Sequence, residues 1–248
     1  MTTPPSGRGG PQRIPRPRLV EQGGPAPWAD LGETERQPDL ATVRLSIAPL
    51  GGGRPFVGGE GQRTRSAVLI PVYEHDGSVH VVLTRRAWHL RSHPGEVSFP
   101  GGRCDPGETP VDTALREAHE ELNLDRGSVE VVGELDHLAT VSSGSLIVPV
   151  VGLLSGRPEL VPAPDEVDAA MHVGLAELLA PETWREELWD ARQWAGQSGG
   201  VQPITFFELE GDTVWGATAN MLRELLGRAT GTGGYDTYGP GGRPPTHR

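Results

Sequence analysis

The feature that most constrains this chain is a capped helix pattern inside the stretch "FPGGRCDPGETPVDTALREAHEELNLD", from Phe99 to Asp125. Thr109 suits the N-cap and Pro110 suits the first helical position. Asn123 suits the left-handed position at which many helices end. The pattern therefore predicts a helix over residues 110–122. The loop before it contains a glycine pair, Gly101-Gly102, and the turn Asp105-Pro106-Gly107.

Three acidic side chains lie within five residues of this helix, and they are Glu117, Glu120 and Glu121. Like charges three or four residues apart oppose a helix by roughly 0.2–0.5 kcal/mol per pair, so the arrangement needs a compensating role. At about 100° per residue the apolar side chains form one stripe, and the acids are expected on the opposite side. That stripe consists of Val111, Leu115, Ala118 and Leu122.

The plain interpretation of these acids is a solvated helix face, and a divalent cation site is the alternative. Two unit charges about 4 Å apart repel by about 4 kcal/mol at an effective dielectric of about 20. A cation such as Mg²⁺ reverses the sign of that interaction, and Mg²⁺ prefers carboxylates, water and substrate phosphates as ligands. Arg116 lies beside the acids and can hold a carboxylate in a fixed orientation. The sequence thus favours a metal platform that faces a phosphate-bearing substrate.

Composition limits the partners of the chain. The formal charge is -11, which argues against general nucleic-acid binding. Residues 1–20 contain no apolar core of a signal peptide, and no run of about 18 apolar residues predicts a membrane span. The single cysteine, Cys104, fits a reducing compartment, and we expect a cytoplasmic protein. A homodimer is compatible with the sequence, which does not fix the oligomeric state.

The chain is expected to consist of one folded domain over residues 39–229 between two disordered tails. Residues 1–38 and 230–248 are rich in proline and glycine and too poor in apolar residues to offset their ordering entropy, apart from a local contact by Trp28. Short apolar runs predict a hairpin over 66–86, strands within 128–141 and over 146–154, and a strand that leads into a short helix near 175. Further on we expect a strand, a turn and a return within 204–216, and an amphipathic helix over 215–228. This mixture predicts an α/β fold.

The helix and the loop before it resemble the signature of the Nudix family, G-x5-E-x7-R-E-U-x-E-E-x-G-U, where U is a bulky apolar residue. The matching residues are Gly102, Glu108, Arg116, Glu117, Glu120 and Glu121. Ala118 and Leu124 occupy apolar positions, and Asn123 replaces the last glycine, a departure that puts only local geometry in question. The resemblance implies an α/β/α sandwich with a mixed sheet and hydrolysis of a nucleoside diphosphate linked to another group.

The resemblance also implies roles for the matching residues. Glu117 and Glu121 correspond to the main ligands of Mg²⁺ or Mn²⁺, and Glu120 shares that task. Arg116 corresponds to the residue that orients these carboxylates. Gly101, Gly102 and Glu108 correspond to structural residues of the junction between loop and helix. The base that accepts a proton from water stays open among Glu120, Glu121 and Glu166, with Asp165 a weaker candidate.

The segment "LTRRAWHLRSHPGEVSFPGG", from Leu83 to Gly102, resembles the extended signature of the coenzyme A pyrophosphatase branch of that family. The later "WGATANML" is similar to a second segment of the branch, whereas "PDEVDAA" departs from a third at Ala169 and Ala170. A cationic cluster in this acidic chain supports the same substrate, because arginine suits bidentate phosphate contacts. The cluster consists of Arg85, Arg86, Arg91 and His93.

Ordinary structural roles compete with each of these assignments. The arginines can be plain surface residues, and His93 can brace the loop instead of transferring a proton. Trp88 and Phe99 are more often packing residues than platforms for a base, and Cys104 has no base nearby in the sequence.

The favoured hypothesis is metal-dependent hydrolysis of the pyrophosphate bond of coenzyme A or its derivatives. The products would be 3′,5′-ADP and 4′-phosphopantetheine or its acyl form. One alternative is a Nudix hydrolase of another small nucleotide, such as ADP-ribose, a dinucleotide polyphosphate or an oxidised nucleotide. The other is a non-catalytic domain that senses a ligand, which the full set of glutamates disfavours.

Overall fold

The computed structural model describes residues 7–47, 53–56, 64–140, 144–190, 192 and 200–233. The larger of its two sheets has eight strands. Five follow the order β4-β3-β2-β8-β6, and of the others β5 pairs with β2, β9 pairs with β3 and β7 pairs with β8. These strands are β2 (Arg65–His75), β3 (Ser78–Arg86), β4 (Val97–Ser98), β5 (Gly101–Arg103), β6 (Glu130–Glu134), β7 (Leu138–Ala139), β8 (Leu146–Leu154) and β9 (Val167–Gly174).

The predicted hairpin and the strand over 146–154 are confirmed. Strands β2 and β3 pair antiparallel around the turn at Asp76 and Gly77, and β8 lies parallel to β2 along its whole length. The sheet is therefore mixed. Strand β2 contributes Ala67 and Leu69 to one face and Ile70 and Val72 to the other, because side chains alternate along a strand. Both faces are covered, so the central strands are apolar nearly throughout.

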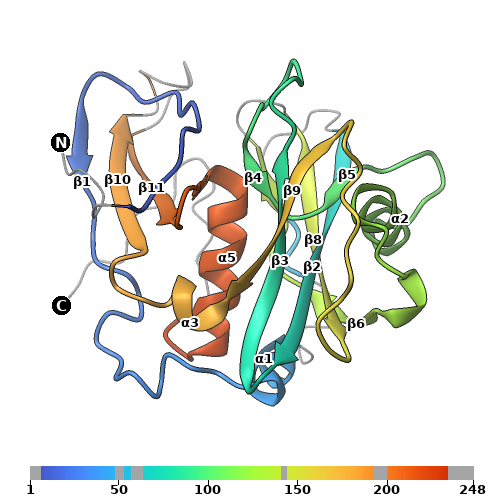
Figure 1. Cartoon of the computed structure of the whole chain (residues 1–248). Helices are drawn as coiled ribbons and strands as arrows, with labels where there is room; N and C mark the ends of the chain where they lie inside the picture. The colour runs from blue at the N-terminus through green and yellow to red at the C-terminus, as the bar shows by residue number, and fades with distance from the viewer. Residues whose placement is uncertain are drawn as a thin grey trace.

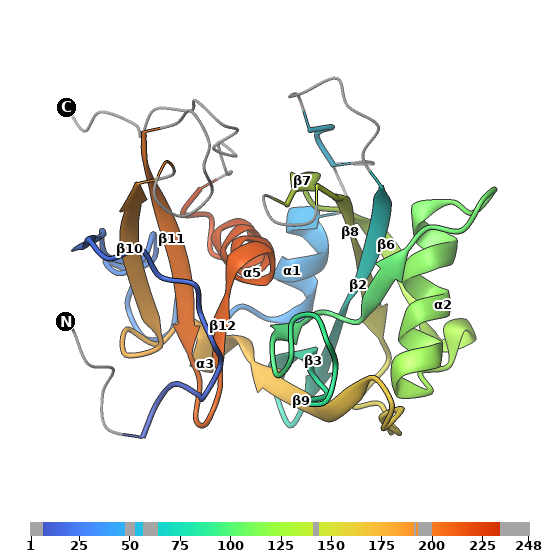
Figure 2. The ribbon, with the colours of Figure 1, turned by 90° about the horizontal axis from the view of Figure 1, so that it is seen from above.

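Helix α2 (Pro110–Leu122) covers one face of this sheet (Figure 2). The Thr109 side chain accepts from the Asp112 backbone amide, and the Asp112 carboxylate accepts from the Thr109 amide. Asn123 ends the helix in the left-handed conformation, with φ 54°. Both predicted ends are confirmed, and a short 3-10 helix, η2 (Arg126–Ser128), follows.

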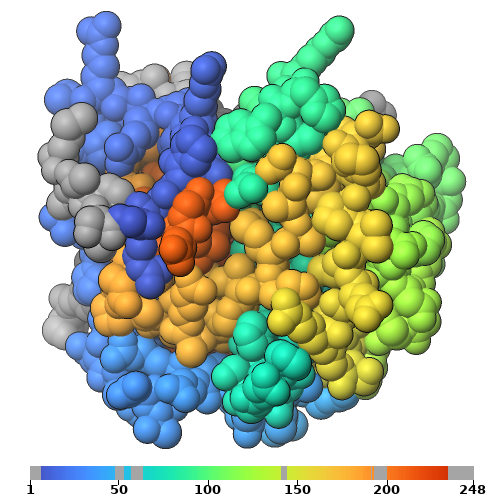
Figure 3. All heavy atoms as spheres, in the orientation of Figure 1, coloured from blue at the N-terminus to red at the C-terminus, as the bar shows by residue number. Residues whose placement is uncertain are grey.

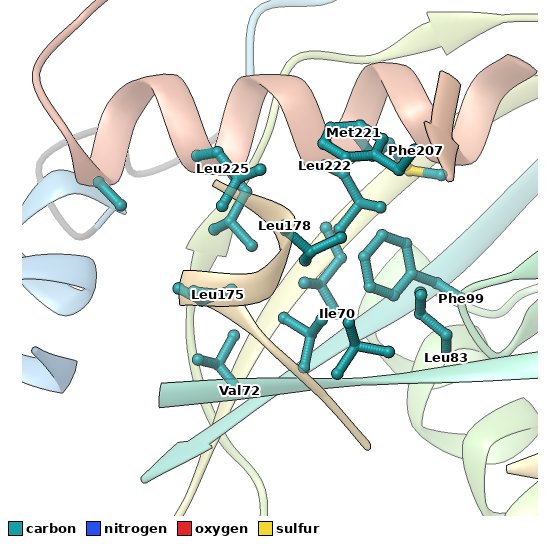
Figure 4. Packing of buried hydrophobic residues seen from close by; sticks show 14 of the residues in the cluster. Ile70, Val72, Leu83, Phe99, Leu175, Leu178, Phe207, Met221, Leu222 and Leu225 are labelled. Atoms are coloured by element: carbon teal, nitrogen blue, oxygen red, sulfur yellow. The ribbon is translucent and has the colours of Figure 1, made fainter. Parts of the chain in front are cut away.

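Helices α1 (Leu40–Ile47), α3 (Leu175–Leu178) and α5 (Gly216–Ala229) lie on the opposite face of the large sheet (Figure 1). Figure 4 shows Leu222 of α5 and Leu178 of α3 directed toward Ile70 and the neighbouring side chains of the sheet. This arrangement, with helices on both faces of a mixed sheet, confirms the expected α/β class. The amphipathic helix predicted over 215–228 is α5, one residue longer at its end.

A second sheet lies beyond α5, on the side away from α2 (Figure 2). Its order is β1-β10-β11-β12, with every pair antiparallel. Its strands are β1 (Val20–Gln22), β10 (Trp184–Asp190), β11 (Val201–Glu208) and β12 (Thr213–Trp215). The strand, turn and return predicted within 204–216 are β11 and β12. Strands β1 and β10 and a separate second sheet were not predicted from the sequence.

The prediction of disorder is wrong for residues 7–38. Trp28 is 1% exposed and stacks on Phe207, with ring centroids 6.2 Å apart, and it meets Trp184 edge-on at 5.3 Å. Strand β1 pairs with β10, and Gln12 is buried. A segment poor in apolar residues becomes ordered here because another part of the chain supplies the apolar surface and the strand edge. The predicted disorder of 230–248 concerns mostly residues 234–248, which lie outside the described residues.

Among the residues that the structure describes, no helix is long and apolar enough to cross a bilayer.

Candidate active site

Arg116 on α2 holds the junction between the glycine loop and the helix. Its guanidinium donates to both oxygens of Glu108, from Nε at 2.8 Å and from Nη2 at 3.0 Å. Nη1 donates to Glu117 at 2.9 Å and to Glu120 at 3.0 Å. Glu108 also accepts from Thr113 and from the Asp105 amide, and the bonds from Arg116 and these groups lower its pKa to about 2. Arg116 therefore contacts Glu108, Glu117 and Glu120 at once, and Glu108 joins the loop to the helix.

Gly101 and Gly102 in β5 form the floor beneath the carboxylates. A Cβ at position 102 would lie 2.3 Å from Oε1 of Glu117, and one at position 101 would lie 2.4 Å from the Ala67 carbonyl oxygen. The Gly101 amide donates to Oε2 of Glu121 at 3.3 Å. Glycine at position 102 lets the Glu117 side chain approach the strand this closely, and glycine at position 101 lets β5 lie this close to the backbone of β2.

Glu121 is 5% exposed, which corrects the expectation that all three acids project from the outer side of α2. Glu117 is partly buried and only Glu120 is exposed. The cause is β5, which crosses the helix beside its apolar stripe and covers the flank that carries Glu117 and Glu121. The buried face of α2 is therefore rotated from the predicted stripe toward Glu121, since its buried residues are Thr113, Ala114, Ala118, Glu121 and Leu122.

Burial and, to a smaller extent, the neighbouring Glu117 carboxylate raise the pKa of Glu121 to about 8, although the Gly101 amide and Arg86 oppose the change. Burial also raises the pKa of Glu117, although Arg116 opposes the change. Glu166, in the turn before β9, acts on both groups as a like charge. The structure therefore brings Glu117, Glu121 and Glu166 to one place, where Arg116 neutralises only part of the negative charge.

This donor set fits a divalent cation of the Mg²⁺ type. In the described part of the chain, no three His, Cys, Asp or Glu side chains converge tightly enough to form a complete metal cage. Mg²⁺ is usually held by one or two carboxylates together with water and substrate phosphates. Glu117, partly buried, and Glu121, buried, supply two carboxylates whose charge is disfavoured without a cation, and the exposed Glu120 lies at the rim.

The four residues of the predicted cationic cluster separate into two groups. Arg85 donates to Asp168 at 2.8 Å and to Asp212 at 2.7 Å, so two carboxylates hold its guanidinium. Arg86, the next residue of β3, attracts Glu121, and its buried Nε has no hydrogen-bond partner in the described structure. The alternation of a strand could have shown that neighbouring arginines point to opposite faces and cannot share one phosphate.

The loop after β3, residues 87–96, carries the other two members of the cluster. Arg91 is exposed. His93 adopts a left-handed conformation with φ 55°, and its Nδ1 lies 2.7 Å from Glu96 Oε2, which supports a bracing role for this ring. The Ala87 amide donates to the Glu166 carbonyl at 2.9 Å, so the loop begins directly beside the acidic site. Phe99 is 1% exposed and packs in the core, whereas Trp88 is 44% exposed.

The comparison with protein families agrees with this geometry. The model of the NUDIX domain matches residues 63–195. The chain belongs to the Nudix family. It is 41% identical over 138 residues to "Nudix hydrolase 3" of Caenorhabditis elegans, covering 54% of this chain and 58% of that protein. It is 36% identical over 161 residues to NudL, a Nudix hydrolase of Photorhabdus laumondii, covering 64% of this chain and 82% of that one.

A plant relative, "Nudix hydrolase 15, mitochondrial" of Arabidopsis thaliana, is 36% identical over 168 residues, which are 64% of this chain and 56% of that protein. The Nudix match does not include residues 7–62, although 7–38 pack against the second sheet. Within the match, Asn123 replaces the last glycine of the Nudix signature. Its φ of 54° is the conformation that glycine adopts readily, so the helix ends as the signature requires.

Sequence reasoning missed Asp168 and Asp212, the partners of Arg85. Asp212 lies 127 residues further along the chain and is 4% exposed. The sequence signals a turn at this position and contains no sign of a contact with β3.

Proposed function

We propose that this Nudix chain hydrolyses the pyrophosphate bond of coenzyme A or its derivatives, with Mg²⁺ or Mn²⁺, to 3′,5′-ADP and 4′-phosphopantetheine or its acyl form. The observation that carries the proposal is a pair of carboxylates, the partly buried Glu117 and the buried Glu121, on a glycine floor near Arg86, whose buried Nε has no hydrogen-bond partner in the described structure. The segment of β3 and the following loop supports coenzyme A over other nucleotides, since its residues resemble those of that branch.

Glu117 and Glu121 would hold the cation, with Glu120 at the rim, and Arg116 would keep their carboxylates oriented. When bound, such an ion polarises phosphate oxygens and lowers the pKa of water. Water attacks one phosphorus, a P–O bond forms, and the bond from that phosphorus to the bridging oxygen breaks. The bridging oxygen leaves with the electron pair as part of the second phosphate.

A carboxylate must accept the proton of the attacking water, and we favour Glu166 over Glu120 and Glu121. Arg116 already holds Glu120, and Glu121 is a proposed ligand of the cation. Glu166 is exposed and lies close enough to act as a like charge on both Glu117 and Glu121, whereas Asp165 is not among the main charges that act on either of them. Arg86 and Arg91 would bind phosphates of the substrate, and His93 would hold the loop in shape. Arg85, held by Asp168 and Asp212, would anchor β3.

Only small-molecule substrates are proposed as partners, and the free thiol of Cys104 fits a reducing compartment such as the cytoplasm. We propose no role for nucleic acid.

The substrate is tested by supplying coenzyme A, ADP-ribose and 8-oxo-dGTP with Mg²⁺ or Mn²⁺ and separating the products by chromatography. We expect turnover of coenzyme A to 3′,5′-ADP. Turnover of only the other two would replace coenzyme A with a different small nucleotide. Tight binding of coenzyme A without cleavage, with either ion, would point to a ligand sensor.

Glu121→Gln tests whether the charge of this carboxylate is needed for catalysis. The variant keeps the size of the side chain and an oxygen that can accept from the Gly101 amide, but it removes the charge. We expect kcat to fall by about 10²–10⁴-fold, as for loss of a group that acts in the transition state, with the circular dichroism spectrum unchanged. Glu74→Gln, the same change at an exposed position, should keep wild-type activity. A Glu121→Gln enzyme within twofold of wild type would remove Glu121 from the mechanism.

A further inference from the structure

A buried amide of the N-terminal segment connects the second sheet to the loop of residues 87–96. Gln12 is 8% exposed, and both the nitrogen and the oxygen of its side-chain amide form hydrogen bonds. Its Nε2 donates to Asp212 Oδ1 at 2.6 Å and to the Gly95 carbonyl at 3.2 Å, and its Oε1 accepts from the Thr213 amide at 3.0 Å. One side chain therefore ties the turn between β11 and β12 to the end of the loop. In Figure 3 the blue surface of the N-terminal segment lies beside the orange surface of the C-terminal part of the chain and near the green surface of its middle part.

The contacts of Gln12 continue to the cationic strand. Asp212, which accepts from Gln12 through Oδ1, accepts from Arg85 through Oδ2 at 2.7 Å. Arg85 also donates to Asp168 of β9. These four side chains form a connected path from the N-terminal segment to β3 and β9, the two strands that flank the start of the loop.

In the described structure the backbone of this loop is also attached at its start, where the Ala87 amide donates to the Glu166 carbonyl at 2.9 Å. At its ends, the Arg86 amide donates to the Glu96 carbonyl at 2.9 Å and the Gly95 amide to the Arg86 carbonyl at 3.2 Å. Gly95 is buried under Trp88, whose ring would lie 2.4 Å from a Cβ at that position. A displacement of Gly95 therefore moves Trp88 and the exposed part of the loop, including Arg91.

We propose that Gln12 is a positioning residue for substrate binding, and that the N-terminal segment is thereby a working part of the active site. The inference rests on the proposed function, since the loop of residues 87–96 is the part assigned to substrate phosphates. Gln12 lies outside the residues 63–195 that the family model matches, so nothing in the Nudix signature assigns it a role.

The test compares Gln12→Ala with wild type in two measurements on the full chain. In steady-state assays with coenzyme A, we expect KM to rise about three- to tenfold, the range that the loss of a hydrogen bond gives, and kcat to change less than about twofold. A rise in KM without a fall in kcat indicates that the loop binds the substrate more weakly while the catalytic centre stays intact. In hydrogen exchange followed by mass spectrometry, the peptide covering residues 87–96 should exchange faster than in wild type.

Gln22→Ala is the matched control, because it makes the same change at an exposed glutamine of the same segment, in β1. It should change neither measurement. If Gln12→Ala fails to fold, both measurements use Gln12→Met instead. Methionine keeps the volume of the side chain without its hydrogen-bond donors and acceptor.

Unchanged exchange in residues 87–96 would overturn the proposal, as would faster exchange with an unchanged KM, which would make Gln12 structural only. A wild-type protein that does not hydrolyse coenzyme A overturns the proposed function instead. The exchange measurement then decides by itself whether Gln12 holds the loop.

Discussion

Glu121 shows how a single position can combine a family signature with an unfavourable environment. Its carboxylate is 5% exposed, lies beside Glu117 and has one weak hydrogen bond, from the Gly101 amide at 3.3 Å. Burial and the neighbouring carboxylate raise its pKa to about 8. A carboxyl group that holds its proton at neutral pH becomes a good ligand only when a cation displaces that proton.

A pH dependence of metal binding follows from this competition. Because a ligand must be deprotonated, the affinity for Mn²⁺ should rise about tenfold per pH unit from about pH 6 to about pH 8 and then level off. Free Mn²⁺ can be measured by electron paramagnetic resonance at constant ionic strength. Glu121→Gln should bind weakly and without this slope. A wild-type affinity that does not vary over this range would show that no proton is displaced from Glu121.

The same raised pKa fixes the sign of the pH effect on the metal-free fold. The unfolded chain releases the Glu121 proton near 4.5, and the folded chain releases it near 8. Between these values the folded state holds more protons, so the contribution of Glu121 to stability is lost as pH rises. In chelator, the melting temperature of Glu121→Gln relative to wild type should therefore increase with pH.

Residue identities in the site could be predicted from the sequence, but their surroundings could not. Arg116, Glu108 and the glycines follow a local spacing, and their contacts agree with it. The burial of Glu121 depends on β5, and the position of the Arg85 guanidinium depends on Asp212, which lies in the turn between β11 and β12 of the second sheet. Each contact joins separate elements of the fold, so the spacing of residues within one element does not predict it.

Among the elements, α2 was predicted closely because its signals are local. The capping box at Thr109 and the left-handed Asn123 define both ends within one or two turns of the chain. Strand β10 gave no comparable signal, since "WREELWD" mixes charged and apolar residues without a clean alternation. It forms because β1 and β11 pair with it on both sides.

The left-handed end of α2 makes a prediction at the scale of the element. Alanine in this conformation costs roughly 1–2 kcal/mol, whereas glycine adopts it freely. We therefore expect Asn123→Ala to lower the free energy of unfolding by about 1 kcal/mol or more, and Asn123→Gly to equal or slightly exceed wild type. Urea unfolding measures both variants. Equal losses for alanine and glycine would mean that the backbone conformation at Asn123 does not limit stability.

At the scale of the whole molecule, the chain joins a Nudix sheet to a second sheet through α5 and the N-terminal segment. The composition of residues 1–38 predicted disorder, and this prediction failed for the described residues 7–38 because composition reports only what a segment can bury by itself. Trp28 packs instead on Phe207 and Trp184, which lie more than 150 residues away in the sequence. The segment also supplies Gln12 to the loop beside the site.

If the N-terminal segment is part of the fold, Trp28→Ala should destabilise the whole protein. Truncation of a buried tryptophan typically costs about 3–5 kcal/mol, and Trp28 is 1% exposed. Trp28→Phe should cost less, because it keeps the ring stacked on Phe207 and removes Nε1, which is buried without a partner in the described structure. Denaturant unfolding followed by circular dichroism measures both.

The control for this experiment is Leu19→Ala, which truncates a side chain of the same segment that is 73% exposed. It should stay within about 0.5 kcal/mol of wild type. A Trp28→Ala protein as stable as this control would mean that the segment packs too weakly to matter. Since Gln12 reaches Gly95 only if the segment is docked, that result would also predict wild-type kinetics for Gln12→Ala, and the two experiments therefore check each other.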